Sequence, residues 1–355
     1  MSRSRSLDEW VSFLSNSDAK RAAQALEVLG ESLCADDGAT RERAAEALLK
    51  ELVREGSTSQ GPILQLLQLS WWPPPVKSAE PALAAVLTGV SRLHVDAPAV
   101  DDAALLVANL YRAASLPLRV LEEALGHGQA SVRKVAAGAV GRVGKGAVSL
   151  LPRLLPLLDD VEPVAGAALE SLGSLAPMEP EVALPALFDQ VARAEGARQY
   201  LALTSLRSVL EEWRREDTPA LDLTSMDGVL SRMAEDPQAP IRLEAICLLG
   251  LGRLSSLTTV ATLRRHLQDE SLDVAVCAAV SLLRVGAPPQ EAAAFLFQRL
   301  TSRETPAETD MVLSMLEGLE AATLARIRDM LEAVAREVQG HVGDAARALL
   351  RQARK

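Results

Sequence analysis

Residues 131–144 read SVRKVAAGAVGRVG, and small or apolar residues return every four positions in this stretch, at Val132, Ala136 and Val140, before a glycine at Gly144. Positions four and eight residues apart lie within roughly 80° of arc on an α-helix. The pattern therefore predicts an amphipathic helix with a narrow stripe of small side chains, which favours close packing against other helices.

The same phrase recurs along the chain. Clear copies start at Asp18, Val161, Ile241 and Val274, and weaker copies start at Thr40, Ala99, Arg198, Glu308 and Val342. From Ile241 onward the copies follow one another at about 34 residues. Leucine-rich segments, such as residues 150–158, lie between the phrases, and polar turns separate the two. Each repeat is therefore predicted to be a helix, a turn and a second helix.

Two of these phrases resemble the second helix of HEAT repeats, SVRKVAA at 131–137 and PIRLEA at 240–245, each after a polar turn. Their spacing is similar to that of the short bacterial HEAT variety, also called the phycobilisome-lyase-type repeat. The resemblance implies that the second-helix arginine, here Arg133 or Arg242, bonds to an aspartate near the turn. It also implies an all-α fold, a right-handed α-solenoid of HEAT-like helix-turn-helix repeats that contact only their neighbours.

Breaks in the repeat pattern divide the chain into four segments. We expect an N-terminal cap of three helices at 1–56, an irregular Pro- and Trp-containing segment at 57–98, HEAT-like repeats at 99–307, and C-terminal repeats with a cap at 308–355.

Composition supports a folded, all-helical chain. Of 355 residues, 48% are hydrophobic and only 3% are aromatic, which argues against disorder and against a β-sandwich. The formal net charge of −10 repels nucleic acid and anionic lipid. Only six lysines occur, a bias that indicates a GC-rich, bacterial source.

The three cysteines, Cys34, Cys247 and Cys277, are far apart and show no metal-binding spacing. We therefore predict reduced thiols. The N-terminus lacks the apolar region of a secretory signal, and the longest uncharged stretch ends in three prolines, so neither export nor a membrane span is expected. The predicted location is the cytoplasm.

Catalytic motifs are missing from the sequence. The stretch from Gly141 to Gly146 differs from a phosphate-binding loop at Ala139 and at Gly146, and a helix end explains its glycines better. The histidines are isolated, and no pair has metal-ligand spacing. We expect a protein that is not an enzyme and that needs no cofactor or metal.

A basic segment is the first candidate binding feature. No acidic residue occurs between positions 124 and 158, whereas the next stretch, to position 192, is strongly acidic. We predict that Arg133, Lys134, Arg142 and Lys145 bind an acidic segment of a partner. The alternative is that adjacent repeats neutralise each other.

Apolar residues opposite the buried stripe are the second candidate. These are Leu243, Cys247, Val276, Val280 and Leu283, which predict a groove for an amphipathic helix, unless neighbouring helices bury them. The adjacent Trp71 and Trp72 point about 100° apart on a helix, so one of them is predicted to be an exposed interface anchor. The alternative is that both pack against the prolines.

The predicted function is that of a non-catalytic scaffold, adaptor or regulator that binds another protein through the solenoid surface. Two alternatives belong to other classes. The resemblance to the phycobilisome-lyase-type repeat implies a tetrapyrrole (bilin) lyase-like protein, and a HEAT-like nucleic-acid-binding protein or DNA glycosylase is the other. The acidic charge and the few aromatic residues argue against nucleic acid as the partner.

Overall fold

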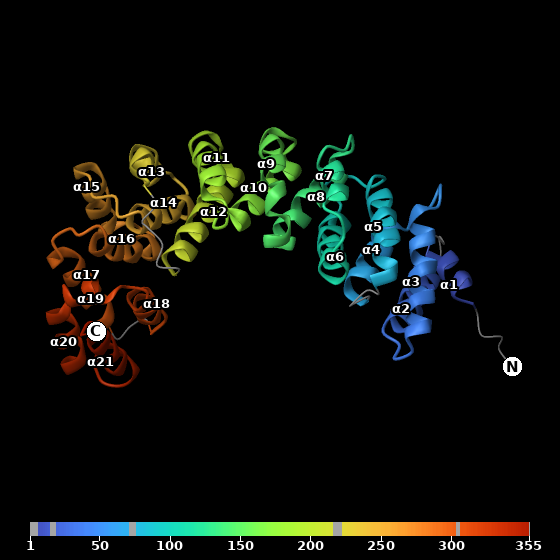
Figure 1. Ribbon diagram of the computed structural model, residues 1–355. Coiled ribbons are helices and arrows are strands. Elements are labelled where there is room, and N and C mark those ends of the chain that lie inside the picture. Colours follow the sequence, from blue (N-terminus) through green and yellow to red (C-terminus); the bar gives the residue numbers. More distant parts are fainter. Residues whose placement is uncertain (1–5, 15–18, 71–75, 216–221, 303–305, 355) are drawn as a thin grey trace. The chain divides into compact units, whose positions relative to one another are not determined.

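The computed structural model describes residues 6–14, 19–70, 76–215, 222–302 and 306–354, and within these ranges every regular element is a helix. The chain divides into two compact units, Met1–Leu187 and Phe188–Lys355. The boundary falls inside α11 (Pro180–Arg193), within the segment predicted to be one run of repeats. In both units a first helix and a second helix alternate along the chain (Figure 1).

Within its described residues, unit 1 begins with three helices in the segment 1–56. Its helices are α1 (Leu7–Leu14), α2 (Ala19–Leu33), α3 (Gly38–Val53), α4 (Gln60–Ser70), α5 (Val76–Val90), α6 (Pro98–Ala114), α7 (Arg119–Leu125), α8 (Ala130–Val143), α9 (Leu151–Leu154) and α10 (Glu162–Leu175). For 57–98 we expect an irregular Pro- and Trp-containing repeat, and the described residues of this segment form α4 and α5. Both helices carry a buried apolar face, which includes Ile63 in α4 and Leu83 in α5. The free energy gained by burying this face is larger than the cost of Pro81, which removes a backbone hydrogen bond inside α5.

Unit 2 continues the alternation to the C-terminus. Its helices are α12 (Gly196–Arg215), α13 (Asp227–Met233), α14 (Ala239–Leu251), α15 (Leu257–Arg265), α16 (Leu272–Arg284), α17 (Gln290–Thr301), α18 (Pro306–Glu317), α19 (Ala321–Ala325), α20 (Arg328–Glu337) and α21 (His341–Gln352). Short 3₁₀ segments extend several of the first helices.

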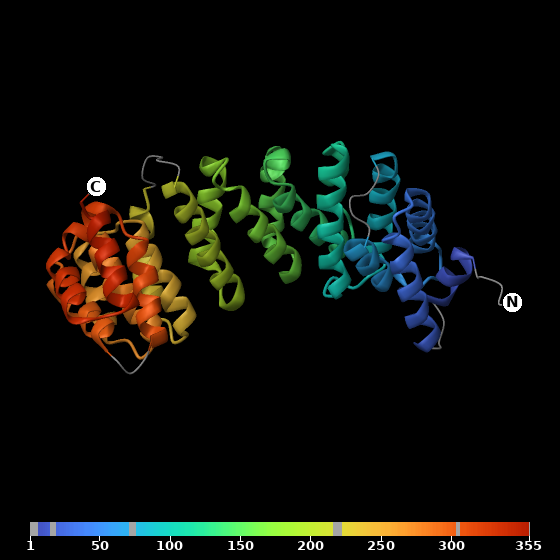
Figure 2. The same cartoon turned by 90° about the horizontal axis from the view of Figure 1, so that it is seen from below.

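The predicted stripe of small residues forms the core. Val132, Ala136 and Val140 of α8 are buried, and so are Ile241 and Ala245 of α14. The second helices pack on one another in series, α4 to α10 in unit 1 and α12 to α16 in unit 2, and Figure 2 shows the same helices from below. Gly144 ends α8 with a positive φ, as expected for a helix C-terminus.

A glycine-serine pair sets the spacing of neighbouring second helices in both units. In unit 1 the Ser171 hydroxyl of α10 donates to the carbonyl of Ala137, and a Cβ on Gly141 would lie only 2.7 Å from the Ser171 Cα. In unit 2 the Ser281 hydroxyl of α16 donates to the carbonyl of Ile246 in α14, four residues before Gly250. Only glycine allows the helices to approach this closely.

Close packing of α14 on α16 also joins two cysteines. Cys247 and Cys277 form a disulfide with their Cα atoms 6.1 Å apart, and Cys34 is free and exposed. The prediction of reduced thiols is therefore wrong for two of the three residues. The sequence shows no pairing signal because the two cysteines lie on different helices that only the stacking brings together.

Reduction of this disulfide is expected to lower the free energy of unfolding by about 3 kcal/mol, because the bond closes a loop across 30 residues of the unfolded chain. Urea unfolding with and without a dithiol reductant measures the change. A protein with both Cys247→Ser and Cys277→Ser serves as the control and should not respond to the reductant. Equal midpoints for the wild type under both conditions would contradict the prediction.

Candidate partner-binding surfaces

Arg133 is held inside unit 1. Its guanidinium donates to both carboxylate oxygens of Asp160, at 2.6 and 2.7 Å, and to the backbone carbonyls of His127 and Gly128. The hydrogen bond to Asp160 is the main cause of the lowered pKa of that carboxyl group. The arginine-aspartate bond that the HEAT resemblance implies is therefore present. Because Arg133 makes its hydrogen bonds within unit 1, its role here is structural.

Arg242 makes the same set of bonds in unit 2. It donates to both carboxylate oxygens of Asp269 and to the carbonyls of Asp236 and Pro237. In each repeat the aspartate lies 27 residues after the arginine, in the turn of the next repeat. The arginine thus ties two consecutive turns together.

Asp269 gives this part of unit 2 a predicted pH dependence. Burial raises its pKa, but hydrogen bonds from Arg242, from the Ser271 backbone and from His266 outweigh that effect and lower the pKa to about 2, from an ordinary 3.8. A carboxyl group with a lowered folded-state pKa stabilises the fold above its unfolded pKa, and this contribution is lost as the pH falls through the folded value.

Wild-type protein is therefore expected to be more stable than Asp269→Asn at neutral pH. The difference should shrink as the pH falls from about 4 to about 2. Urea unfolding of both proteins over this range measures it. A difference that stays constant down to pH 2 would contradict the assignment.

Lys134 is also engaged within unit 1. Its ammonium group lies 2.8 Å from an Asp101 carboxylate oxygen of α6, and its side chain is only 15% exposed. Arg153 pairs with Glu122 in the same way, at 2.7 Å. Neighbouring repeats thus neutralise three of the five basic residues in the predicted segment, Arg133, Lys134 and Arg153.

Arg142 and Lys145 differ from these three. Both are exposed, and within the described part of the chain no ion pair joins either to an acidic side chain. Arg112 of α6, which the sequence analysis did not single out, is also exposed and donates to the backbone carbonyl of Arg142 at 2.6 Å. The predicted basic surface is therefore reduced to Arg142 and Lys145 and extended by Arg112.

The apolar groove is not open where it was predicted. Val276, Val280 and Leu283 are 0, 2 and 1% exposed, because the helices packed around α16 cover it on all sides. Leu243 and Cys247 of α14 are partly exposed, and Cys247 is held by the disulfide. The prediction of a groove through these α16 residues is therefore wrong. Trp71 and Trp72 lie outside the described residues.

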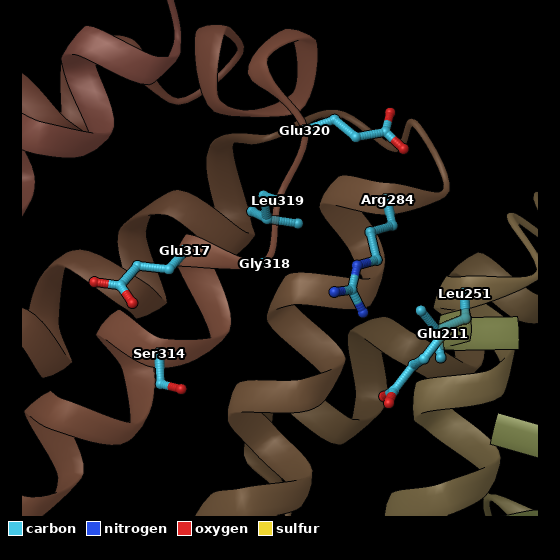
Figure 3. Close-up of a pocket in the computed structure, with 8 residues that line it drawn as sticks. All are labelled: Glu211, Leu251, Arg284, Ser314, Glu317, Gly318, Leu319 and Glu320. Atoms are coloured by element: carbon cyan, nitrogen blue, oxygen red, sulfur yellow. The ribbon is translucent and has the colours of Figure 1, made fainter. Parts of the chain in front are cut away.

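A cavity of about 620 Å³ opens in unit 2 at the C-terminal ends of the second helices α12, α14, α16 and α18 (Figure 3). It is lined by Glu211, Leu251, Arg284, Ser314, Glu317, Gly318, Leu319 and Glu320. Figure 3 shows Arg284 extending into the space between Glu211 and the Gly318–Leu319 turn. We call this cavity the unit 2 pocket.

Ion pairs hold two walls of the unit 2 pocket. Arg207 of α12 donates to Glu211 at 3.1 Å and to Glu244 of α14 at 2.6 Å. Burial raises the pKa of Glu244, against the opposing effect of Arg207. At the rim, the Arg253 guanidinium lies 2.5 and 2.6 Å from the two carboxylate oxygens of Glu320, although the residues are 67 positions apart. These pairs fix charged side chains around an open, polar cavity.

Sequence reasoning missed this pocket although the repeat offered a signal. Leu251, Arg284 and Glu317 each end a second helix, and they follow one another at the repeat spacing. The positions predicted for binding on α14 and α16 lay on the helix face opposite the buried stripe instead. Helix ends and the loops after them commonly carry binding residues because they are not needed to pack the stack.

No group of three metal-ligating side chains occurs in the part of the chain that the structure describes. Among the same residues, no helix is long and apolar enough to cross a membrane.

Comparison with known proteins supports the fold and leaves the family open. Neither protein-family models nor curated proteins match the sequence significantly. Among solved structures, an engineered protein matches with 15% identity and a TM-score of 0.58, over 99% of this chain and 98% of that chain. The karyopherin Kap121p bound to the SUMO protease Ulp1p matches with 15% identity and a TM-score of 0.59, over 98% of this chain and 40% of that chain.

Kap121p bound to Nup53p gives a similar result, with 14% identity and a TM-score of 0.56, over 96% of this chain and 41% of that chain. The chain thus spans about two fifths of the length of Kap121p. At this identity the likeness concerns the fold alone. It confirms the predicted class, an all-α solenoid of HEAT/ARM-like repeats.

Proposed function

We propose that this chain is a non-catalytic solenoid of the short bacterial HEAT type that binds a segment of another protein and acts as a scaffold, adaptor or regulator. The unit 2 pocket is the observation that carries the proposal. It is open, it is large enough to take side chains of a bound segment, and packed helix ends with fixed ion pairs surround it.

The structural likeness supports the same function. The solved structures of Kap121p with Ulp1p and with Nup53p are complexes between a solenoid of this class and another protein. Repeat stacks present long rows of equivalent side chains, which suit them to an extended partner. Specificity for one partner then comes from the residues at the C-terminal ends of the second helices, as in the unit 2 pocket.

Selection from a displayed library of unbiased peptide segments tests this function. Segments that bind the wild-type chain should do so saturably, with a Kd in the micromolar range. Gly318→Trp should weaken their binding about tenfold or more, because the new side chain fills the pocket from a position where a Cβ makes only ordinary contacts, 3.6 Å from the Met315 carbonyl oxygen and 3.8 Å from Arg284 Nη2.

Gly228→Trp is the matched control, because Gly228 in α13 is also exposed and has open space around it. It should leave binding unchanged. A selection that yields no saturable binder would contradict the proposed function. The two alternatives are tested separately, by the absorbance of the purified protein for a tetrapyrrole and by binding to duplex DNA at low salt for nucleic acid.

A further inference from the structure

Three cationic residues occur near the C-terminal ends of α6 and α8. Arg112 lies two residues before the end of α6, Arg142 lies in the last turn of α8, and Lys145 follows in the next segment. The hydrogen bond from the Arg112 guanidinium to the carbonyl of Arg142 brings the first two together. We call Arg112, Arg142 and Lys145 the basic cluster.

Within the described residues, no ion pair neutralises the basic cluster. The other cations of this region are paired, Arg133 with Asp160, Lys134 with Asp101 and Arg153 with Glu122. The basic residues of this region thus fall into a paired, structural group and an exposed group of three without ion pairs at the C-terminal ends of α6 and α8.

The helix ends explain how three like charges are tolerated at one place. The C-terminus of a helix carries a partial negative charge, which stabilises nearby cations. The Arg112 guanidinium donates to the carbonyl of Arg142 at the end of α8, and the Arg142 guanidinium donates to the carbonyl of Gly138, one turn earlier in the same helix. These bonds hold the two guanidinium groups in place at the surface, and both retain further N–H groups for an incoming acceptor.

We propose that the basic cluster binds an acidic segment of the partner protein, one in which glutamate or aspartate side chains lie close together. This rests on the proposed function and names the chemistry of the partner. Carboxylates accept paired hydrogen bonds from guanidinium groups, so each arginine offers a geometric match as well as a charge. Lys145 adds a mobile ammonium group beside them.

A peptide suits the basic cluster better than nucleic acid does. Nucleic-acid sites on a protein combine extended positive charge with exposed aromatic side chains on which bases stack. Here the net charge is −10, and the aromatic residue next to Arg112 in sequence, Tyr111, is buried with its hydroxyl donating to the carbonyl of Pro117. Burial raises the pKa of Tyr111 to about 12.

Fluorescence anisotropy with a labelled peptide rich in glutamate and aspartate tests the proposal. The wild-type chain should bind this peptide with an affinity that falls as salt is raised, because exposed charges are screened. Arg142→Glu combined with Lys145→Glu should weaken binding about tenfold or more. Arg142→Gln with Lys145→Gln should weaken it less, since it removes attraction without adding repulsion.

The controls separate the basic cluster from general charge. Lys50→Glu reverses one charge at another exposed position of unit 1, half the change of the double variant, and should leave the affinity within about twofold. Circular dichroism confirms that each variant is folded. A peptide with lysine in place of its acidic residues should bind the doubly reversed variant more tightly than it binds the wild type.

Unchanged affinity of the doubly reversed variant would overturn the proposal, and so would equally tight, equally salt-dependent binding of duplex DNA. These results are distinct from failure of the proposed function. If the library selection yields binders that are not acidic and that do not respond to the basic-cluster variants, protein binding stands and the acidic segment is excluded. If it yields no binder, the proposed function itself fails.

Discussion

Replacing Gly250 with alanine is expected to lower the free energy of unfolding by about 3 kcal/mol, although alanine is the better helix former. A Cβ at position 250 of α14 would lie 2.6 Å from the Cβ and 2.8 Å from the Cα of Ser281 in α16. Backbone and Cβ atoms cannot rotate away, so the two helices must separate. That movement also strains the hydrogen bond from Ser281 to the carbonyl of Ile246.

Urea unfolding followed by circular dichroism measures the change. Gly166→Ala in α10 is the control, since a Cβ there meets no atom within 4 Å, and it should stabilise the protein by about 0.5 to 1 kcal/mol. Adding Ser281→Ala to Gly250→Ala should not restore stability, because the clash involves the backbone of Ser281. A loss below about 0.5 kcal/mol for Gly250→Ala would contradict the close approach of α14 and α16.

Arg242→Met is expected to cost about 3 to 5 kcal/mol, because it removes the guanidinium from a buried carboxylate that then keeps only its bonds from His266 and the Ser271 backbone. The side chains of Arg242 and Asp269 are 8 and 5% exposed. The carbonyls of Asp236 and Pro237 lose their donor at the same time. Methionine fills much of the space but donates no hydrogen bond.

The loss of unfolding free energy can be compared with that of two other Arg→Met variants, measured in the same way. Arg133→Met should cost less than Arg242→Met, because the pair between Arg133 and Asp160 is more exposed to solvent. Arg119→Met should cost at most about 0.5 kcal/mol, since its pair with Glu123 lies on the surface. Equal effects at all three positions would mean that burial does not govern these bonds.

Local patterns were sufficient to predict the repeats, and the resemblance to HEAT repeats implied the arginine bonds. The four-residue stripe from Val132 to Val140 determines which face of α8 is buried, and the likeness of the motif around Arg133 to HEAT repeats implied its bond to an aspartate near the turn, Asp160. Both depend on residues within one repeat and its neighbour. The fold class could therefore be predicted from sequence.

Contacts between repeats were harder to predict. The position of Lys134 in its own helix predicts an exposed cation, but Lys134 forms an ion pair with Asp101 on the preceding second helix. The sequence pattern predicts that Val276 and Val280 form an open apolar face. In the stack, however, neighbouring helices bury both sides of this helix, which is apolar all round. The spacing of α14 and α16 that joins Cys247 to Cys277 likewise depends on the packed structure.

Hydrogen exchange with and without a selected partner segment tests the central claim most directly, that this solenoid binds a protein at the ends of its second helices. We predict slower exchange of the backbone amides at Gly318, Leu319 and Glu320 when the segment is bound, because these residues line the unit 2 pocket. The first helix α15 should exchange at the same rate in both samples. Unchanged exchange at 318–320, or slowing confined to α15, would contradict the account.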